Sequence, residues 1–387
     1  MRVIRCDGSP AAVRELTAAV RAVLDGGEAL APVGPGQAPP PRDPGPGQVV
    51  VTTSGSTAQP KRVQLSADAL RASAAAAHAR LGGPGQWLLA LPAQHVAGLQ
   101  VLVRAALAST RTVVLDLCGG FDPAGFGAAA RRLTGGGKRY TALVPTQLAR
   151  LLDSDLNTDI GALTGFDGVL LGGAAAPNGL VRRARAAGVP VVTTYGMTET
   201  SGGCVYDGWP LDGAEVRLDT TGSAGAGRIE LAGPMLATGY LDAPAEDCAA
   251  FRNGWFLTSD LGRLDEQGRL QVLGRADDVI VTGGVKVSPA DVEAVLTGLP
   301  GVGDVCVVGL PDPEWGEQVA AVVVPADPAR PPDPDGLRAA ARGLLDGART
   351  PKTIVLLDAL PLRGVGKLDR SAVRALLTQR PVDPAPW

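Results

Sequence analysis

The sequence predicts a large α/β core followed by a small α+β domain. Three observations carry this prediction. Short apolar segments alternate with helical segments as far as residue 200, which is typical of a mostly parallel sheet covered by helices on both faces. From about Gly202, short alternating runs separated by Gly-rich turns indicate antiparallel strands. The end of the chain holds a capped helix, two apolar strands and a further helix.

The core elements follow from start signals and periodicity. Ser9 and Pro10 are an N-cap and a first helical residue, and Ser66 caps an Ala-rich helix that ends near Leu81. Residues 32–47 are rich in Pro and Gly and are expected to form a surface loop. The other core strands are predicted at 87–91, 112–117, 140–144, 169–171 and 189–194, with helices at 96–108, after Asp122, at 146–152 and at 180–187.

The second half of the chain is predicted from shorter signals. Strands are expected at 215–218, 228–231, 254–258 and 269–273, with a hairpin turn over 265–268. Ser288 is expected to cap a helix, followed by strands at 305–308 and 319–323 and a helix near 335–345. We therefore predict two domains, residues 1–275 and 276–387.

Composition excludes several classes of function. A net charge of −3 over 387 residues gives no electrostatic footprint for nucleic acid. The five Cys are scattered without close pairs and only two His are present, so neither a zinc-finger site nor a His-based metal site is expected. The sequence shows no signal peptide and no run of about 18 apolar residues, so we expect no membrane span and a cytoplasmic location.

Residues 49–61 are the segment around which the chain is organised. Three Val residues predict a buried strand, and a polar loop follows it. The loop contains Thr53, Ser54, Gly55, Ser56, Thr57 and Lys61. A Gly that permits positive φ lets backbone N–H groups point into one concavity, and hydroxyls with an ammonium complete a cradle for polyphosphate. Because residues 62–65 look extended, we expect the loop to join two strands, unlike a Walker A loop; a solvated Ser/Thr turn is the alternative.

Further motifs follow this loop in a set order. They are Tyr195-Gly196-Met197-Thr198-Glu199-Thr200, expected just past a strand end; a loop that carries Asp260; Gly274-Arg275-Ala276-Asp277-Asp278; Gly283-Gly284; and Gly366-Lys367-Leu368-Asp369-Arg370. Together they span residues 49–370 and resemble the adenylate-forming superfamily of acyl-CoA synthetases, adenylation domains and luciferases. Segments 143–148 and 171–175 are similar to the o-succinylbenzoate–CoA ligases of menaquinone synthesis. The resemblance implies a distorted β-barrel within the core and a mobile C-terminal domain.

The resemblance assigns roles in binding ATP and Mg²⁺. The loop from Thr53 to Lys61 would hold the β- and γ-phosphates. Thr198 would contact the α-phosphate, and Glu199 would bind Mg²⁺, which prefers carboxylate oxygens. Tyr195 and Gly196 would contact adenine. Asp260 would bind the ribose hydroxyls, and Arg275 would assist it. Gly173 and Ala174 would complete the nucleotide site. A solvated Glu199 and a purely structural Asp260–Arg275 ion pair are the alternatives.

The resemblance also assigns roles around the acid and coenzyme A. His95 would be the aromatic gate beside the acyl pocket, unless it is an ordinary core histidine. Asp277 would be the hinge between domains, and Gly283 and Gly284 would line the pantetheine channel. Lys367 would be the catalytic lysine of adenylation, unless it is a solvated tail residue. The implied reaction joins a small-molecule carboxylic acid to CoA through an acyl-AMP, with o-succinylbenzoate as the expected acid.

Two alternatives and two departures stay open. Another aryl- or fatty acyl-CoA synthetase or a stand-alone adenylating enzyme fits the same motifs, and a non-catalytic nucleotide-binding protein is the remote alternative. Ala58 stands where the family usually has Gly. Only about fifty residues precede the phosphate loop, so we expect a reduced N-terminal subdomain. The resemblance leaves a homodimer open.

Overall fold

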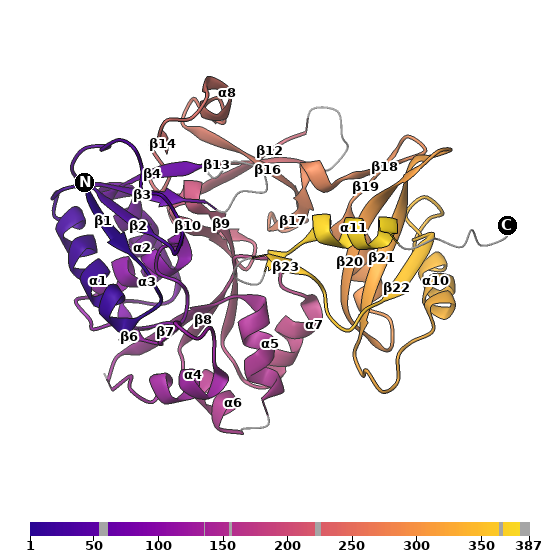
Figure 1. Cartoon of the computed structure of the whole chain (residues 1–387), viewed down its shortest axis with the longest axis horizontal. Coiled ribbons are helices and arrows are strands. Elements are labelled where there is room, and N and C mark those ends of the chain that lie inside the picture. Colours follow the sequence, from indigo (N-terminus) through magenta and orange to yellow (C-terminus); the bar gives the residue numbers. More distant parts are fainter. Residues whose placement is uncertain (54–60, 135, 155–156, 221–225, 364–366, 380–387) are drawn as a thin grey trace.

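The computed structural model describes residues 1–53, 61–134, 136–154, 157–220, 226–363 and 367–379. Figure 1 shows a large body that contains the strands up to β17 and a smaller body formed by the elements from β18 onward. The helices are α1 (Pro10–Leu24), α2 (Ala67–Arg80), α3 (Val96–Leu107), α4 (Pro123–Ala130), α5 (Pro145–Asp153), α6 (Asn157–Thr164), α7 (Asn178–Ala186), α8 (Ala245–Cys248), α9 (Pro289–Thr297), α10 (Pro334–Arg342) and α11 (Arg370–Gln379).

A seven-stranded sheet forms the centre of the large body, in the order β11–β10–β9–β8–β7–β5–β6. Its strands are β5 (Gly85–Leu89), β6 (Val113–Val114), β7 (Lys138–Leu143), β8 (Gly168–Leu171), β9 (Val191–Met197), β10 (Gly202–Tyr206) and β11 (Trp209–Pro210). Strands β5 to β9 pair in parallel, and β10 runs antiparallel to β9. Neighbouring residues of β5 enter different cores: Trp87 packs with residues of α1, α2 and α3, and Leu88 with residues of α4, α5 and α7. Helices therefore cover both faces, as predicted.

A second sheet carries the phosphate loop. It contains β1 (Arg2–Arg5), β2 (Leu30–Val33), β3 (Gln48–Thr52), β4 (Arg62–Ser66) and β14 (Gly239–Tyr240). Strands β3 and β4 form an antiparallel hairpin with Thr52 opposite Arg62, which confirms that the loop joins two strands. Strands β1 and β2 were not predicted. The expected loop at 32–47 is wrong at its first two residues, which belong to β2.

Antiparallel strands form the region for which a distorted barrel is expected. These are β12 (Glu215–Asp219), β13 (Gly227–Ala232), β15 (Phe251–Arg252), β16 (Trp255–Leu264) and β17 (Leu270–Arg275). Two local predictions are wrong, one in this region and one in the central sheet. Asp260 lies within β16 rather than on a loop, because that strand continues to pair with β13 and β17. Tyr195 and Gly196 lie within β9 rather than past its end, because β10 folds back and pairs with them.

The smaller body is the predicted α+β module. It contains β18 (Ile280–Thr282), β19 (Val285–Val287), β20 (Val302–Asp312), β21 (Gly316–Pro325) and β22 (Thr353–Leu356), with the short hairpin β23 (Leu362–Arg363) and β24 (Lys367–Leu368). Ser288 caps α9 as predicted, since its Oγ accepts a hydrogen bond from the Asp291 N–H. The fold class is confirmed, whereas the domain boundary at residue 275 stays a prediction. Among the described residues no helix is long and apolar enough to cross a membrane.

Candidate active site

A tight turn at the end of β9 places the first motif. The 3-10 turn η1 (Thr198–Thr200) ends at Ser201, whose φ of 51° reverses the chain into β10. The Thr200 hydroxyl accepts from the Met197 N–H at 2.9 Å and donates to the Gly202 carbonyl at 2.7 Å. A Cβ at Gly196 would lie 2.2 Å from the Gly202 carbonyl oxygen, so only Gly fits there. Thr198 and Glu199 are therefore presented on a fixed turn at the carboxyl edge of the sheet, where α/β sheets bind ligands.

Tyr195 and Asp260 meet directly. The Tyr195 hydroxyl donates a 2.8 Å hydrogen bond to Oδ2 of Asp260, which joins the central sheet to β16. Burial, together with the Asp260 charge, raises the pKa of Tyr195, so the phenol stays protonated and remains the donor. Burial also raises the pKa of Asp260 above the usual carboxyl value. The second Asp260 oxygen is the acceptor that a ribose diol needs, beside an aromatic ring that suits adenine.

Arg275 lies next to this pair but does not bind it. Asp260 on β16 is directly opposite Arg275 on β17. The Arg275 guanidinium instead pairs with Asp277 at 3.0 Å; Arg275 is half-buried, and Asp277 is exposed. The structural Asp260–Arg275 ion pair is therefore not the contact that holds Asp260. Arg275 has the reach to serve either a nucleotide or the segment predicted to be the hinge.

Glu199 belongs to a second cluster of side chains, which the sequence did not predict. Oε1 of Glu199 accepts a 2.8 Å hydrogen bond from the Tyr240 hydroxyl. Nζ of Lys61 lies 5.0 Å from the centre of the Tyr240 ring and pairs with Asp247 at 2.6 Å. Glu199 thus keeps one carboxylate oxygen without this bond, which suits a hard cation. No group of three or more metal-ligating side chains occurs within the described ranges, so phosphate oxygens would have to supply other ligands.

The two ends of the phosphate loop are joined. The Thr53 N–H donates to the Lys61 carbonyl at 2.8 Å, and the Thr53 hydroxyl reaches the same oxygen at 3.3 Å. Thr53 and Lys61 are half-buried at the end of the hairpin. The predicted contacts Ser54, Gly55, Ser56 and Thr57, and the unusual Ala58, lie outside the described residues.

His95 and the segment after β8 lie at carboxyl ends of parallel strands. His95 is the half-buried N-cap residue of α3, which follows β5. Gly173 has a φ of 79°, and a Cβ at the preceding Gly172 would lie 2.2 Å from the Thr194 hydroxyl oxygen. Gly172 therefore passes close to β9, and Gly173 and Ala174 directly follow it in the sequence. Nothing in the structure tests His95 as a gate.

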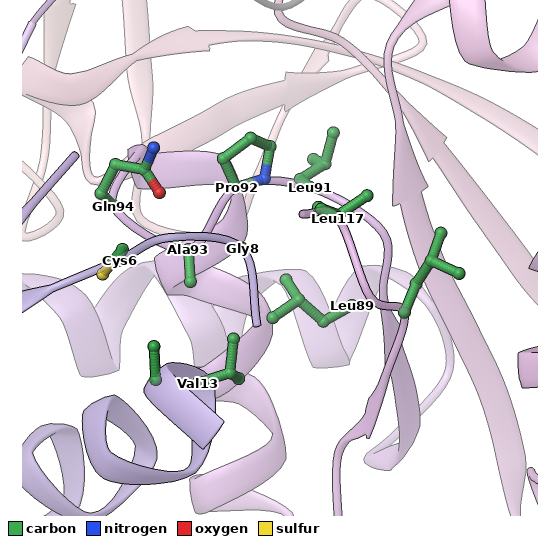
Figure 2. Close-up of a pocket in the computed structure, with 11 residues that line it drawn as sticks. Cys6, Gly8, Val13, Leu89, Leu91, Pro92, Ala93, Gln94 and Leu117 are labelled. Atoms are coloured by element: carbon green, nitrogen blue, oxygen red, sulfur yellow. The ribbon is translucent and has the colours of Figure 1, made fainter. Parts of the chain in front are cut away.

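An apolar pocket lies near this edge. Figure 2 shows it between α1, the end of β5 and the segment after β6, with Leu89, Leu91, Leu117 and Val13 among its lining residues. Burial raises the pKa of the Cys6 thiol in its wall to about 11, so this thiol is protonated near neutral pH. The lining therefore lacks the chemistry of a phosphate or acid site, although it runs through Pro92–Gln94 to the residue before His95.

The remaining predicted residues lie on the small body. Gly283 and Gly284, with φ of 56° and 80°, form the two-residue turn between β18 and β19. The Gly283 N–H donates to the Trp315 carbonyl, and a Cβ at Gly283 would lie 2.5 Å from Cε3 of the Trp315 ring. The Lys367 backbone pairs with Arg363 in the β23–β24 hairpin, while its side chain lies outside the described part of the chain.

Family models match both bodies. A model described as AMP-binding enzyme matches residues 4–241, and one described as AMP-binding enzyme C-terminal domain matches residues 291–367. The chain belongs to the AMP-binding enzyme family. The two matches fall on either side of the predicted hinge, so both parts of an AMP-binding enzyme are present in one chain.

Individual relatives narrow the similarity. A probable 2-succinylbenzoate–CoA ligase of Mycobacterium tuberculosis H37Rv is 48% identical over 327 residues, which cover 84% of this chain and 83% of the relative. A feruloyl-CoA synthase of Streptomyces sp. is 33% identical, covering 84% and 69%. Among solved structures, the O-succinylbenzoate CoA synthetase of Bacillus subtilis with AMP is 29% identical, with a TM-score of 0.71 and 86% and 69% covered. ATP-bound MatB of Rhodopseudomonas palustris is 27% identical, with a TM-score of 0.76 and 97% and 79% covered.

These similarities confirm the predicted superfamily and the predicted likeness to o-succinylbenzoate–CoA ligases. The roles of individual residues remain predictions, because no comparison assigns them. Tyr240 and Asp247, which complete the Glu199 cluster, were missed. Each is far from Glu199 and Lys61 in sequence, and a single Tyr or Asp in a short polar segment carries no local pattern.

Proposed function

We propose that this chain is the ATP- and CoA-dependent ligase of 2-succinylbenzoate, acting through an acyl-AMP intermediate. The observation that carries the proposal is the 48% identity to a 2-succinylbenzoate–CoA ligase over most of both chains. The predicted class of enzyme, an acid–thiol ligase, is confirmed by the family and by its CoA-ligase relatives. A CoA ligase of this kind would serve menaquinone biosynthesis, as the sequence predicted.

The site geometry supports the adenosine half of this proposal. Tyr195 and Asp260 offer an aromatic face and a carboxylate oxygen side by side, joined by their 2.8 Å hydrogen bond. An adenine on the ring would bring its ribose hydroxyls to Asp260. Arg275, opposite Asp260, would turn from Asp277 to the nucleotide. Thr198 and Lys61 would face the phosphates from two different segments.

Glu199 fits the role of magnesium ligand. Its side chain lies on the fixed turn η1, one of its oxygens is held by Tyr240, and a solved relative from Bacillus subtilis is described in complex with ATP and magnesium ion. A bound Mg²⁺ would lower the charge repulsion between ATP phosphates and an incoming carboxylate. The residues of this chain would hold the acid near His95 and Gly173 and the nucleotide at Tyr195.

Two steps make up the reaction. In the first, the substrate carboxylate oxygen attacks the α-phosphorus, the bond to the bridging oxygen breaks, and pyrophosphate leaves; the Lys367 ammonium would neutralise charge that develops between the two anions. In the second, the CoA thiolate attacks the acyl carbon and AMP leaves. We propose that the small domain turns at Asp277 between the steps, so that Gly283 and Gly284 line the thiol channel. The cytoplasmic location and the homodimer stay predictions.

A substrate panel tests the proposal. Pyrophosphate release and thioester formation should be measured with ATP, CoA and, in turn, 2-succinylbenzoate, benzoate, ferulate, indoleacetate and a medium-chain fatty acid. We expect the highest kcat/KM with 2-succinylbenzoate and no thioester without ATP. A higher kcat/KM for ferulate or a fatty acid would show that the proposed acid is wrong, whereas the proposed class of reaction would stand. ATP binding without acid-dependent pyrophosphate release would refute the enzyme itself.

A further inference from the structure

One short segment connects the expected metal carboxylate to the phosphate-loop hairpin. The Ala237 N–H donates to the Glu199 carbonyl at 2.8 Å. One residue later, the Thr238 N–H donates to the Gln64 carbonyl at 2.9 Å on β4. The Leu241 N–H then donates to the Arg62 carbonyl at 2.8 Å. Residues 237–241 therefore fix the backbone that carries Glu199 relative to the strand that follows Lys61.

The Tyr240 side chain repeats this connection within the site. Its hydroxyl donates to Oε1 of Glu199 at 2.8 Å, and its ring lies 5.0 Å from Nζ of Lys61. An edge-to-face contact with Phe251, with ring centres 5.4 Å apart, fixes the plane of the Tyr240 ring. A single side chain thus contacts both the carboxylate and the ammonium expected at the phosphates.

The second charged group of the cluster is also fixed. Lys61 pairs with Asp247 at 2.6 Å, and both side chains are about one-third exposed. Asp247 follows Tyr240 by seven residues in sequence. Strand β14 therefore supplies the partner of Glu199, and the segment that follows it supplies a partner for the Lys61 ammonium.

We propose that Tyr240 is a positioning residue that orients Glu199 for its metal and keeps it in register with Lys61. A carboxylate with one oxygen held by a phenol presents the other oxygen in a defined direction and loses less rotational freedom when it binds a cation. The inference rests on the proposed metal role of Glu199. It adds that a tyrosine outside the recognised motifs sets the metal affinity of the site.

The test compares Tyr240→Phe with Tyr140→Phe. Both variants lose one phenol hydroxyl and keep the ring, but the Tyr140 hydroxyl shares its hydrogen between the carbonyls of Leu81 and Gly83, away from the site. Mn²⁺ binding in the presence of ATP, followed by electron paramagnetic resonance, needs neither acid nor turnover. We expect Tyr240→Phe to weaken Mn²⁺ binding about 10-fold, the usual loss when a partner of a metal ligand is removed, and Tyr140→Phe to leave it unchanged.

A double-variant cycle shows whether Tyr240 acts through Glu199. If it does, adding Tyr240→Phe to Glu199→Gln should produce no further loss of Mn²⁺ affinity. An unchanged affinity in Tyr240→Phe, or losses that simply add in the double variant, would overturn the inference. An unchanged affinity in Glu199→Gln would refute the metal role of Glu199, and absence of acyl-AMP formation by the wild type would refute the proposed function. Thermal unfolding of each variant checks that the fold is retained.

Discussion

The nucleotide side of the large domain and the lysine side of the small domain are built differently. In the large domain, functional side chains bind one another: Tyr195 holds Asp260, and Tyr240 holds Glu199. In the small domain, the predicted functional groups lie on the turn between β18 and β19 and on the β23–β24 hairpin, and a side chain outside these elements supports the domain. The support is Arg370, whose guanidinium makes two contacts with Glu293 and donates to the Val307 carbonyl at 2.7 Å.

This difference agrees with the proposed mechanism, in which a preorganised site binds the nucleotide and the small domain delivers groups to it. Side chains that are already hydrogen-bonded in the right geometry need little rearrangement when a nucleotide binds. A group on a separate domain can leave after one step and be replaced by another. Arg370 also lies 3.5 Å from Asp278, beside the expected hinge. If the small domain turns as proposed, this contact would keep the segment after the Lys367 hairpin attached to the residue that follows the predicted hinge.

The largest expected effect is loss of the small-domain support in Arg370→Ala. Removing Arg370 leaves the partly buried Glu293 carboxylate with the Val307 N–H but without this cation, and breaking such a pair costs up to about 3–5 kcal/mol of stability. Hydrogen exchange should show faster exchange in α9 and β20 and unchanged protection in α2 and α3. Arg370→Lys, which keeps the charge but loses the bidentate geometry, should fall between wild type and Arg370→Ala. Equal destabilisation of both domains would contradict the separation.

Lys367→Ala should next separate the two half-reactions. Loss of a charge-neutralising group is expected to slow adenylation by about 10²–10³-fold. CoA attack on a finished acyl-AMP has no anion pair to bridge, so this step should keep nearly the wild-type rate. Single-turnover assays with acid and ATP, and separately with synthetic acyl-AMP and CoA, measure the two rates. Equal loss of both in a folded variant would show that Lys367 is not delivered for one step.

A pH effect that depends on histidine should be confined to the large domain. Both histidines of the chain, His78 and His95, precede residue 276. Burial and the nearby Arg104 charge lower the pKa of His78 from 6.5 to about 4. The unfolded chain therefore binds a proton that the folded chain rejects, so stability falls as the pH drops from about 6.5 to 4, by at most about 3 kcal/mol. His78→Leu should flatten this part of the stability curve in urea titrations, and an unchanged slope would contradict the assignment.

Asp260→Asn tests the preorganised side with a smaller change. Loss of the charged acceptor should raise the KM for ATP roughly 10-fold or more, because hydrogen bonds to charged groups are worth about 1.5–3 kcal/mol. The KM for the acid should not change. In thioester formation from synthetic acyl-AMP, only the binding of the acyl-AMP should become weaker. A fall in kcat with an unchanged KM for ATP would place Asp260 outside the ribose site.

The sequence predicted elements whose signals are local. Ser9, Ser66, Asp122 and Ser288 cap helices as expected, since an N-cap is recognised from a few neighbouring residues. Strands β1 and β2 were missed, because the four residues Arg2–Arg5 and the Pro-containing Leu30–Val33 become strands only by pairing with each other and with β3. Tertiary pairing also extended β9 and β16 through the residues expected to follow them.

The site followed the same rule. Tyr195, Glu199 and Asp260 could be selected from the sequence because each stands in a contiguous motif, and the structure brings Tyr195 to Asp260, in agreement with their predicted shared role. Tyr240 and Asp247 act on residues 41 and 186 positions away. Such contacts have no sequence period, so only the folded chain shows them. The contact between Gly283 and Trp315 is of this kind, and it gives the finest test of the small domain.

Gly283→Ala and Gly284→Ala form a matched pair. Both residues have positive φ, so each substitution costs about 1 kcal/mol of backbone strain. Only at Gly283 would the new methyl meet the Trp315 ring, at 2.5 Å, whereas nothing lies within 4 Å of a methyl at Gly284. Trp315 is 43% exposed and can move away, so the turn shifts but the domain stays folded. We therefore expect Gly283→Ala to slow thioester formation about 10-fold, corresponding to about 1.4 kcal/mol, with adenylation unchanged. Gly284→Ala should slow it less if the shape of the turn is what counts. If both variants slow thioester formation equally, each methyl obstructs the thiol channel directly. If a variant slows adenylation as much as thioester formation, this turn is not delivered for the second step alone.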